Sequence, residues 1–184
     1  MTSVAVRWRR LDVPGHDACR LDEAADGWRL RGAAVFLLDG VPAQLDYRVE
    51  CNTSWGSRSA SVQGSVGTQR VDITVAREDD GRWLVNDAPV PGLDDCADVD
   101  FGFTPATNIL QLRRIALAVG EAADVPVAWL DVPAGTLLRL EQRYHRLAAD
   151  RYDYDAPRFA YHAVIEVNDA GFARRYPGLW ELTE

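Results

Sequence analysis

Apolar residues recur at every second position along most of this chain, and that periodicity constrains the fold more than any other feature. The segment QLDYRVECN is the clearest case, because its apolar residues alternate with polar ones: Leu45, Tyr47, Val49 and Cys51. Successive side chains of a strand point to opposite faces of a sheet. The pattern therefore predicts a strand with one buried and one solvated face.

Similar segments recur through the chain, and we count about ten, separated by turn signals roughly every 8–12 residues. The segment TLLRLEQRYHRLAA, residues 136–149, fits the period of a strand and that of a helix. We assign it to strand because the alternating segment FAYHAVIEV follows soon after it. This spacing predicts an all-β sandwich, a barrel or a strongly curved sheet.

One segment, TNILQLRRIAL, has the apolar spacing of a helix, and we expect that helix within residues 106–118. Thr107 or Asn108 could cap its start, because both residue types favour the N-cap position. Gly120 could end it, since glycine adopts the left-handed conformation that often terminates helices.

Length and charge narrow the class of protein. A chain of 184 residues fits one domain spanning residues 1–184. The net charge of −8 would repel phosphate backbones, so nucleic acid is not an expected partner. We find no signal peptide and no apolar run of about 18 residues, and therefore expect a cytoplasmic protein without an integral membrane segment.

Cysteine and histidine give no signal for metal or nucleophilic chemistry. The three cysteines are odd in number and widely spaced, which favours reduced, buried thiols: Cys19, Cys51 and Cys96. No cysteine or histidine has metal-ligand spacing, and no serine lies in a G-x-S-x-G motif. We expect no metal and no cofactor.

Two aspartates, Asp98 and Asp100, should point to the same face of a strand, with Cβ atoms roughly 7 Å apart. Carboxylates placed in this way could bind a divalent metal, share acid–base work, or pair with arginines. No histidine or third acid lies nearby in a compatible motif, which favours pairing with Arg113 or Arg114. Adjacent arginines on a helix diverge by about 100°, so one could point inward while the other faces solvent.

A neutral polar group, Thr104, Thr107 and Asn108, surrounds Pro105. These side chains could satisfy the loop backbone and cap the helix, or they could bind a hydroxyl-rich ligand at the mouth of a pocket. The six tryptophans and six tyrosines could likewise pack the sheet or line an apolar cavity. Trp129 and Tyr144 are the aromatics that we expect to face such a cavity.

The segment DVDFGFTPATNILQLRRIAL, residues 98–117, resembles the signature of the glycolipid-binding family, a bacterial domain of unknown function. That signature is Asp-Val-Asp, a few residues, Thr-Pro-x-Thr-Asn, an apolar pair, Pro, an apolar residue and Arg-Arg-Leu. Gln111 replaces the usual Pro and Ile115 stands for Leu, while the remaining positions match: Asp98, Asp100, Thr104, Pro105, Thr107, Asn108, Arg113 and Arg114. Flanking segments such as VAWLDVP, EQRYHRL and DAGFARRYPGLW are also similar, so the resemblance extends from about Val6 to Trp180.

The resemblance implies a mainly β fold similar to bacterial lipoprotein-carrier proteins, in which a strongly curved antiparallel sheet or unclosed barrel wraps around one or two short helices. It also implies a glycolipid ligand, an inference that itself derives from the fold. We expect a strand to enter the half-barrel, turn at Pro105 and place the helix across the opening. A polar cluster beneath the helix would then recognise a headgroup or fix the helix to the sheet.

Three functions follow as hypotheses. The first is non-enzymatic binding of a glycolipid or similar amphiphile. The second is a hydrolase or isomerase acting on a sugar or lipid, with Asp98 or Asp100 as general base. The third is a structural interaction module without a ligand. For the first we expect no catalytic residue and these ligand-binding residues: Asp98, Asp100, Thr104, Thr107, Asn108, Arg113, Arg114, Trp129 and Tyr144.

Overall fold

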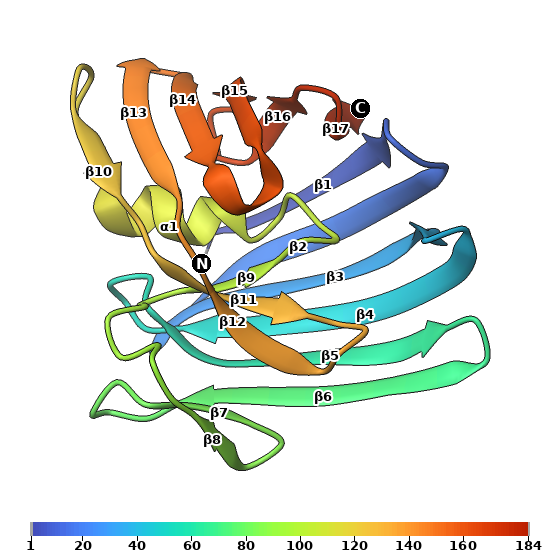
Figure 1. Ribbon diagram of the computed structural model, residues 1–184. Helices are drawn as coiled ribbons and strands as arrows, with labels where there is room; N and C mark the ends of the chain where they lie inside the picture. Colours follow the sequence, from blue (N-terminus) through green and yellow to red (C-terminus); the bar gives the residue numbers. More distant parts are fainter. Residues whose placement is uncertain (1, 184) are drawn as a thin grey trace.

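The computed structural model describes residues 2–183, and its largest element is a 14-stranded antiparallel sheet that curves strongly without closing (Figure 1). Six long strands follow one another in the first part of the chain: β1 (Ser3–Arg10), β2 (Gly15–Ala24), β3 (Gly27–Leu38), β4 (Val41–Cys51), β5 (Ser57–Val66) and β6 (Gln69–Arg77). Each pairs with the next through a short turn, so this part of the sheet is a simple meander.

Shorter strands continue the sheet on both sides. Beyond β6 lie β7 (Trp83–Val85) and β8 (Ala88–Val90). On the other side, β1 pairs with β17 (Trp180–Thr183). Outward from β17 lie β16 (Ala173–Tyr176), β15 (Tyr161–Val167), β14 (Arg151–Ala156), β13 (Arg143–Ala148) and, at the edge, β10 (Ala122–Asp124). The pairing of β1 with β17 joins the two ends of the chain into one continuous sheet.

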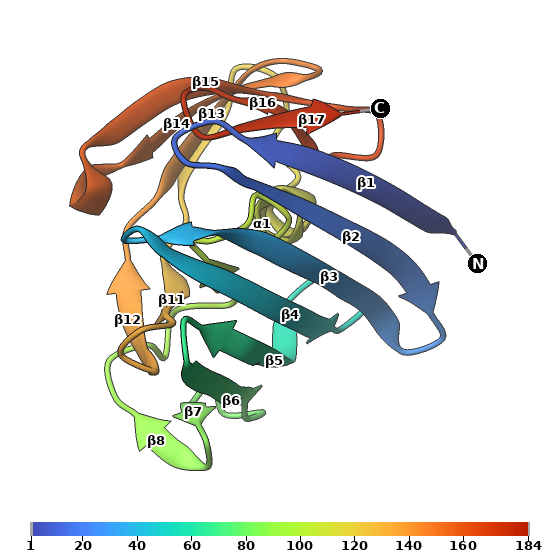
Figure 2. The same ribbon diagram turned by 90° about the vertical axis from the view of Figure 1, so that its right-hand side faces the viewer.

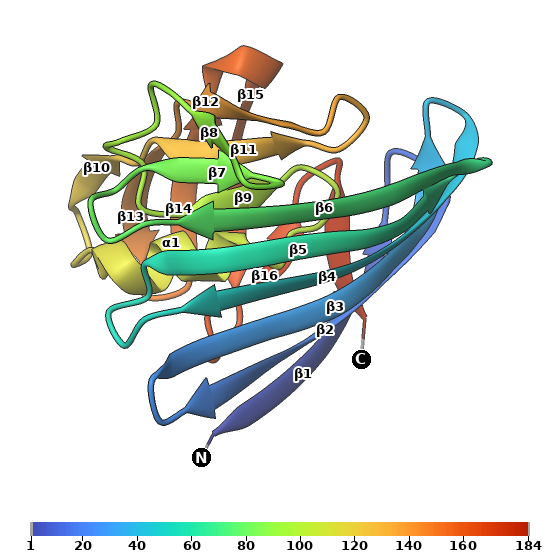
Figure 3. The ribbon, with the colours of Figure 1, turned by 90° about the horizontal axis from the view of Figure 1, so that it is seen from below.

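A second layer fills the inside of the curve. It consists of a three-stranded sheet of β9 (Val99–Phe101), β11 (Val127–Asp131) and β12 (Thr136–Leu140), together with the helix α1 (Asn108–Ile115). Figure 2 looks along α1 and shows it enclosed by the large sheet, while Figure 3 shows the long strands from below. A 3-10 turn, η1 (Pro157–Phe159), connects β14 to β15. We call β9, α1, β11 and β12 the inner layer.

The long strands curve around a core because their apolar residues alternate. In β4, Leu45, Tyr47 and Val49 are buried, and the residues between them are exposed or half-buried. The matching positions of the neighbouring strands are buried as well, including Leu30 on β3 and Val62 on β5. At about 25 cal/mol per Å² of apolar surface, this burial supplies the main stabilisation of the sheet.

The predicted mainly β fold, with an open, strongly curved sheet around a short helix, is confirmed. Residues 136–149 are strand and not helix, as expected, although they form two strands, and α1 lies inside the predicted range. The number of strands was underestimated, since residues 2–183 contain 17. The predicted helix end was also wrong: α1 ends at Ile115, and its C-cap is Ala116, not Gly120. Ala116 is left-handed, and its N–H is bonded to the Leu112 carbonyl. Thr107 is the N-cap residue, but its side chain makes no capping hydrogen bond.

Candidate functional site

A cavity of about 420 Å³ lies between the inner layer and the large sheet, where β1, β3, β4 and the C-terminal strands contribute to its wall. Its wall is mostly apolar and aromatic, with contributions from both sheets: Phe36, Phe103, Trp129, Tyr154, Tyr176 and Trp180. Phe159 also lines it, is 49% exposed, and contacts the Trp129 ring edge-on at 5.3 Å between centroids. Volume and lining both lie in the range typical of small-molecule sites, roughly 300–1,000 Å³ with few polar groups.

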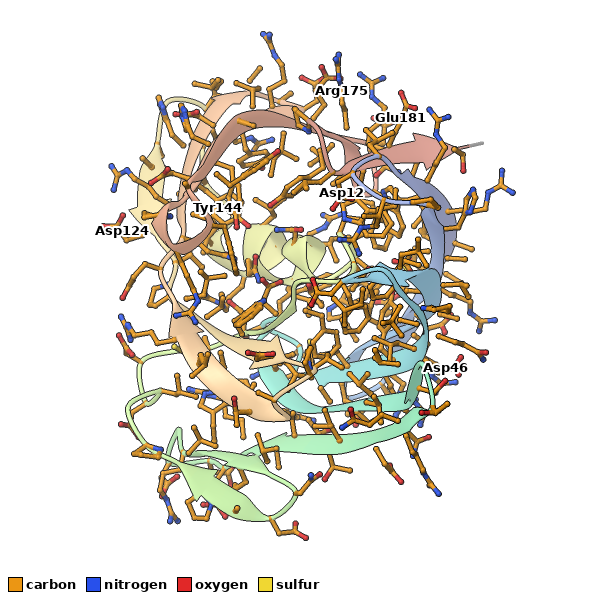
Figure 4. All side chains as sticks on the ribbon, turned by 45° about the vertical axis from the view of Figure 1, so that its right-hand side comes forward. Asp12, Asp46, Asp124, Tyr144, Arg175 and Glu181 are labelled. Carbon is orange, nitrogen blue, oxygen red and sulfur yellow. The ribbon has the colours of Figure 1, made fainter. Side chains whose placement is uncertain are left out.

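A polar network built around Asp100 lies between this cavity and the helix. Asp100 accepts hydrogen bonds from Thr107 Oγ1 at 2.6 Å and from Gln142 Nε2 at 3.2 Å. The Tyr144 hydroxyl accepts one from Asn108 Nδ2 and donates one to Gln111 Oε1, each at 2.9 Å. Figure 4 shows Tyr144 between the C-terminal strands and the helix. The network thus connects β9 and α1 to β13.

Burial dominates the electrostatics of Asp100. It raises the pKa of this carboxyl above its ordinary value, although the hydrogen bond from Thr107 favours the charged form. Asp100 also contributes to the cavity wall, together with Thr104 and Asn108. A ligand in the cavity would therefore meet a small polar surface in an otherwise apolar wall.

Asp98, two residues earlier on the chain, has a different role. It is fully buried, and its Oδ2 accepts a hydrogen bond from Arg114 Nε at 2.8 Å. The two side chains form an ion pair, with 2.7 Å between Arg114 Nη2 and Asp98 Oδ2. Burial raises the pKa of Asp98, while Arg114 opposes that shift. The predicted pairing of one arginine with one aspartate is confirmed, and it fixes the end of α1 to the inner sheet. Arg113 points elsewhere: it donates to the Ala170 carbonyl at 2.5 Å and lies over the Trp55 ring.

A third buried carboxyl, Asp17 on β2, was not anticipated from the sequence. It accepts hydrogen bonds from the hydroxyls of Thr104 and Tyr47, the latter at 3.0 Å to Oδ2. Burial raises the pKa of Asp17 to about 7, and the bond from Thr104 limits the shift. Thr104 also accepts a bond from the Ala106 N–H, so this contact fixes the turn at Pro105 to the large sheet.

The structure divides the expected ligand-binding residues into two groups. Asp100, Thr104, Asn108 and Trp129 line the cavity. The other five do not line it and instead make the contacts described above: Asp98, Thr107, Arg113, Arg114 and Tyr144. Tyr144, expected to face the cavity, instead has a fully buried ring whose hydroxyl belongs to the Asp100 network.

The cavity has one cationic wall residue that the sequence did not single out. Arg10, the last residue of β1, lines it beside Trp180, its partner across the β1–β17 pairing. Its guanidinium forms a bidentate ion pair with Asp12, through Nε at 2.7 Å and Nη2 at 3.0 Å. The sequence signal was present but weak: Arg10 continues the inward-facing positions of Val4, Val6 and Trp8.

Within the described part of the chain, no three histidine, cysteine or acidic side chains are grouped to hold a metal ion. All three cysteines are free and buried. No helix in residues 2–183 is both long and apolar enough to span a membrane.

Fold and site together define a half-open antiparallel sheet whose concave face holds an inner layer and an aromatic-walled cavity. A family model described as "Putative glycolipid-binding" matches residues 5–181, and the chain belongs to that family. The crystal structure of a DUF1089 family protein from Pseudomonas aeruginosa is similar, with a TM-score of 0.78 and 26% sequence identity over 98% of this chain and 92% of the other. No curated protein matches the sequence.

Proposed function

We propose that this protein binds a glycolipid or a similar amphiphile in the cavity and catalyses no reaction on it. The observation that carries the proposal is the two-part wall, in which aromatic and aliphatic side chains surround a small polar surface formed by Asp100, Thr104 and Asn108. An acyl chain would lie against the aromatic part, and a polar group would reach the hydrogen-bonding part. The family description supports the same ligand class.

Chain length gives a first quantitative test. Each methylene group moved from water to an apolar wall contributes about 0.8 kcal/mol, or roughly fourfold in affinity. Alkyl glucosides of increasing chain length, titrated by calorimetry, should therefore bind progressively tighter until the cavity is full. Native mass spectrometry of gently purified protein should show a co-purifying amphiphile. Absence of any such species, together with no thermal shift across the series, would contradict the proposal.

A cavity-filling variant tests the location. Ala156 lines the cavity and is 1% exposed, so Ala156→Phe should reduce amphiphile binding at least tenfold by occupying the space. Ala33→Phe makes the same change at an exposed position of β3 and should leave binding unchanged. Asn108→Ala should alter the preference among headgroups, because its amide lies in the polar part of the wall. Equal binding by Ala156→Phe and the wild type would place the ligand elsewhere.

One observation favours a second candidate, a hydrolase or isomerase with Asp100 as general base. Its carboxyl lines the cavity, has a raised pKa, and is not neutralised by an arginine, unlike that of Asp98. However, both of its oxygens already accept hydrogen bonds from Thr107 and Gln142. Asp100→Asn separates the candidates. If the protein is an enzyme, the variant should no longer turn over a co-purified ligand. If it is a carrier, the variant should still bind that ligand.

A further inference from the structure

The Arg10 guanidinium is held rigidly at the cavity wall. Asp12 engages Nε and Nη2 on one edge, and the rings of Phe36 and Trp180 flank the group at 4.8 and 5.2 Å from their centroids. Only 13% of the side chain is exposed. Figure 4 shows Asp12 after the end of β1, beside the C-terminal strands. An arginine fixed on three sides has little conformational entropy left to lose on binding a further group.

The third nitrogen of this guanidinium, Nη1, is left unpaired by the described residues. Nη1 is buried and has no hydrogen-bond partner among residues 2–183. One other buried polar atom of the cavity wall is unpartnered in the same part of the chain, the indole Nε1 of Trp129. Both atoms are donors, whereas the buried acceptors of Asp100 are already occupied by Thr107 and Gln142. The buried wall therefore offers two unpartnered donors, which acceptor atoms of a ligand would satisfy.

We propose that the ligand of this cavity is an anionic amphiphile, whose carboxylate or phosphate group pairs with Arg10 Nη1. The inference rests on the proposed function and specifies the chemistry of its ligand. A sugar hydroxyl both donates and accepts hydrogen bonds, so these two donors would use only its acceptor capacity. An anionic oxygen only accepts and therefore matches them better. A charge-assisted bond from arginine is also stronger than one between neutral groups, and the flanking rings exclude water from it.

The ion pair with Asp12 gives Arg10 a structural role, but this role leaves Nη1 buried without a hydrogen-bond partner in the described part of the chain. Asp12 uses the edge formed by Nε and Nη2, so the opposite side of the guanidinium is left for a second acceptor. A buried donor without a partner costs roughly 1–3 kcal/mol. An anion from the ligand would remove that cost upon binding.

The test compares two probes with the same chain. Dodecanoate at pH 8 carries an anionic head, and dodecyl glucoside carries a neutral, hydroxyl-rich head; both are titrated below the concentrations at which they form micelles. We expect the wild-type protein to bind dodecanoate more tightly. Arg10→Met, which keeps the aliphatic bulk, should weaken dodecanoate binding about tenfold to hundredfold and change glucoside binding less than twofold. Dodecyl phosphate should behave like dodecanoate, whereas acetate and inorganic phosphate, lacking the chain, should bind weakly.

Arg9→Met is the matched control, because Arg9 precedes Arg10 on β1 but pairs with Glu181 at the exposed surface. It should bind both probes as the wild type does. If Arg10→Met does not fold, the preference of the wild-type protein between the two probes decides alone. Equal or tighter binding of the glucoside, or equal losses for both probes in Arg10→Met, would overturn the anionic ligand and leave amphiphile binding intact. Failure of every probe to bind the wild type would overturn both proposals.

Discussion

The large outer sheet and the inner layer bury different kinds of side chain. On β4 the inward positions hold Leu45 and Val49, while an acid such as Asp46 points to solvent (Figure 4). In the inner layer and the residues that flank its helix, Asp98, Asp100 and Thr107 are buried beside equally buried apolar residues. The sheet is therefore stabilised mainly by apolar area, whereas the inner layer is oriented by specific polar contacts. Substitutions should consequently have different effects in the two regions.

The largest effect is expected at the ion pair between Asp98 and Arg114. Arg114→Ala should lower the free energy of unfolding by about 3–5 kcal/mol, because it leaves a buried carboxylate without its partner. Arg113→Ala is the adjacent control; its side chain is exposed and bonds a backbone carbonyl, so the loss should stay within about 1 kcal/mol. Urea denaturation measures both, and equal stability of the two variants would show that the pair does not fix the helix.

A pH effect of nearly the same size is expected from Asp17. Its pKa is about 7 in the folded protein, against an ordinary 3.8, so the folded state binds more protons than the unfolded state between these values. Stability should therefore fall as pH rises from about 4 to 7, by at most about 4 kcal/mol at roughly 1.4 kcal/mol per pH unit.

The variant Asp17→Asn should remove this contribution and flatten the stability–pH curve in that interval. Asp46→Asn makes the same change at an exposed position of β4 and should keep the wild-type slope. Thermal unfolding at a series of pH values distinguishes them. Parallel curves for all three proteins would show that Asp17 titrates as it does in the unfolded chain.

A smaller loss is expected in the Asp100 network. Tyr144→Phe removes the hydroxyl that joins Asn108 to Gln111, and the unpartnered amides should cost about 1–3 kcal/mol. Tyr152→Phe, on the neighbouring strand, is the control, because its ring packs edge-on against Tyr144 and its hydroxyl has no part in this network. Equal melting temperatures for the two variants would contradict a structural role for the hydroxyl.

The smallest effect belongs to the outer face of the sheet. Val35 on β3 is 60% exposed, and Val35→Thr should change the free energy of unfolding by no more than about 0.5 kcal/mol. The β-branched shape is retained, so strand propensity is nearly unaffected. A loss comparable to that of Tyr144→Phe would remove the distinction between the two regions.

Much of the outer sheet was predictable because its alternation is a local property. Among the six long strands the exception is β2, which the sequence analysis did not identify: it contains no β-branched residue, although Asp17, Cys19 and Leu21 share its buried face. The signal for a buried carboxyl was an aspartate at an alternate position of the same strand as two apolar residues. The helix end was missed because Ala116 adopts a left-handed conformation that sequence alone assigns to glycine.

For the candidate site, the sequence indicated the segment but not the side of the wall on which each residue lies. The pairing of Asp98 with an arginine followed from spacing and charge. That Arg114 and not Arg113 makes it depends on how α1 packs, and that Arg10 reaches the cavity depends on β1 meeting β17. Such contacts join residues far apart in the chain, and local periodicity carries no information about them.

The pairing of β1 with β17 also has a consequence for biosynthesis. Arg10 leaves the ribosome early, but Trp180, which flanks its guanidinium, is made some 170 residues later. The long meander of β1 to β6 can pair as it emerges, since each strand contacts the next one along the chain. The cavity wall is complete only when the last strand arrives. Nascent chains must therefore keep a partly covered apolar face from aggregating until β17 has been synthesised and has paired with β1.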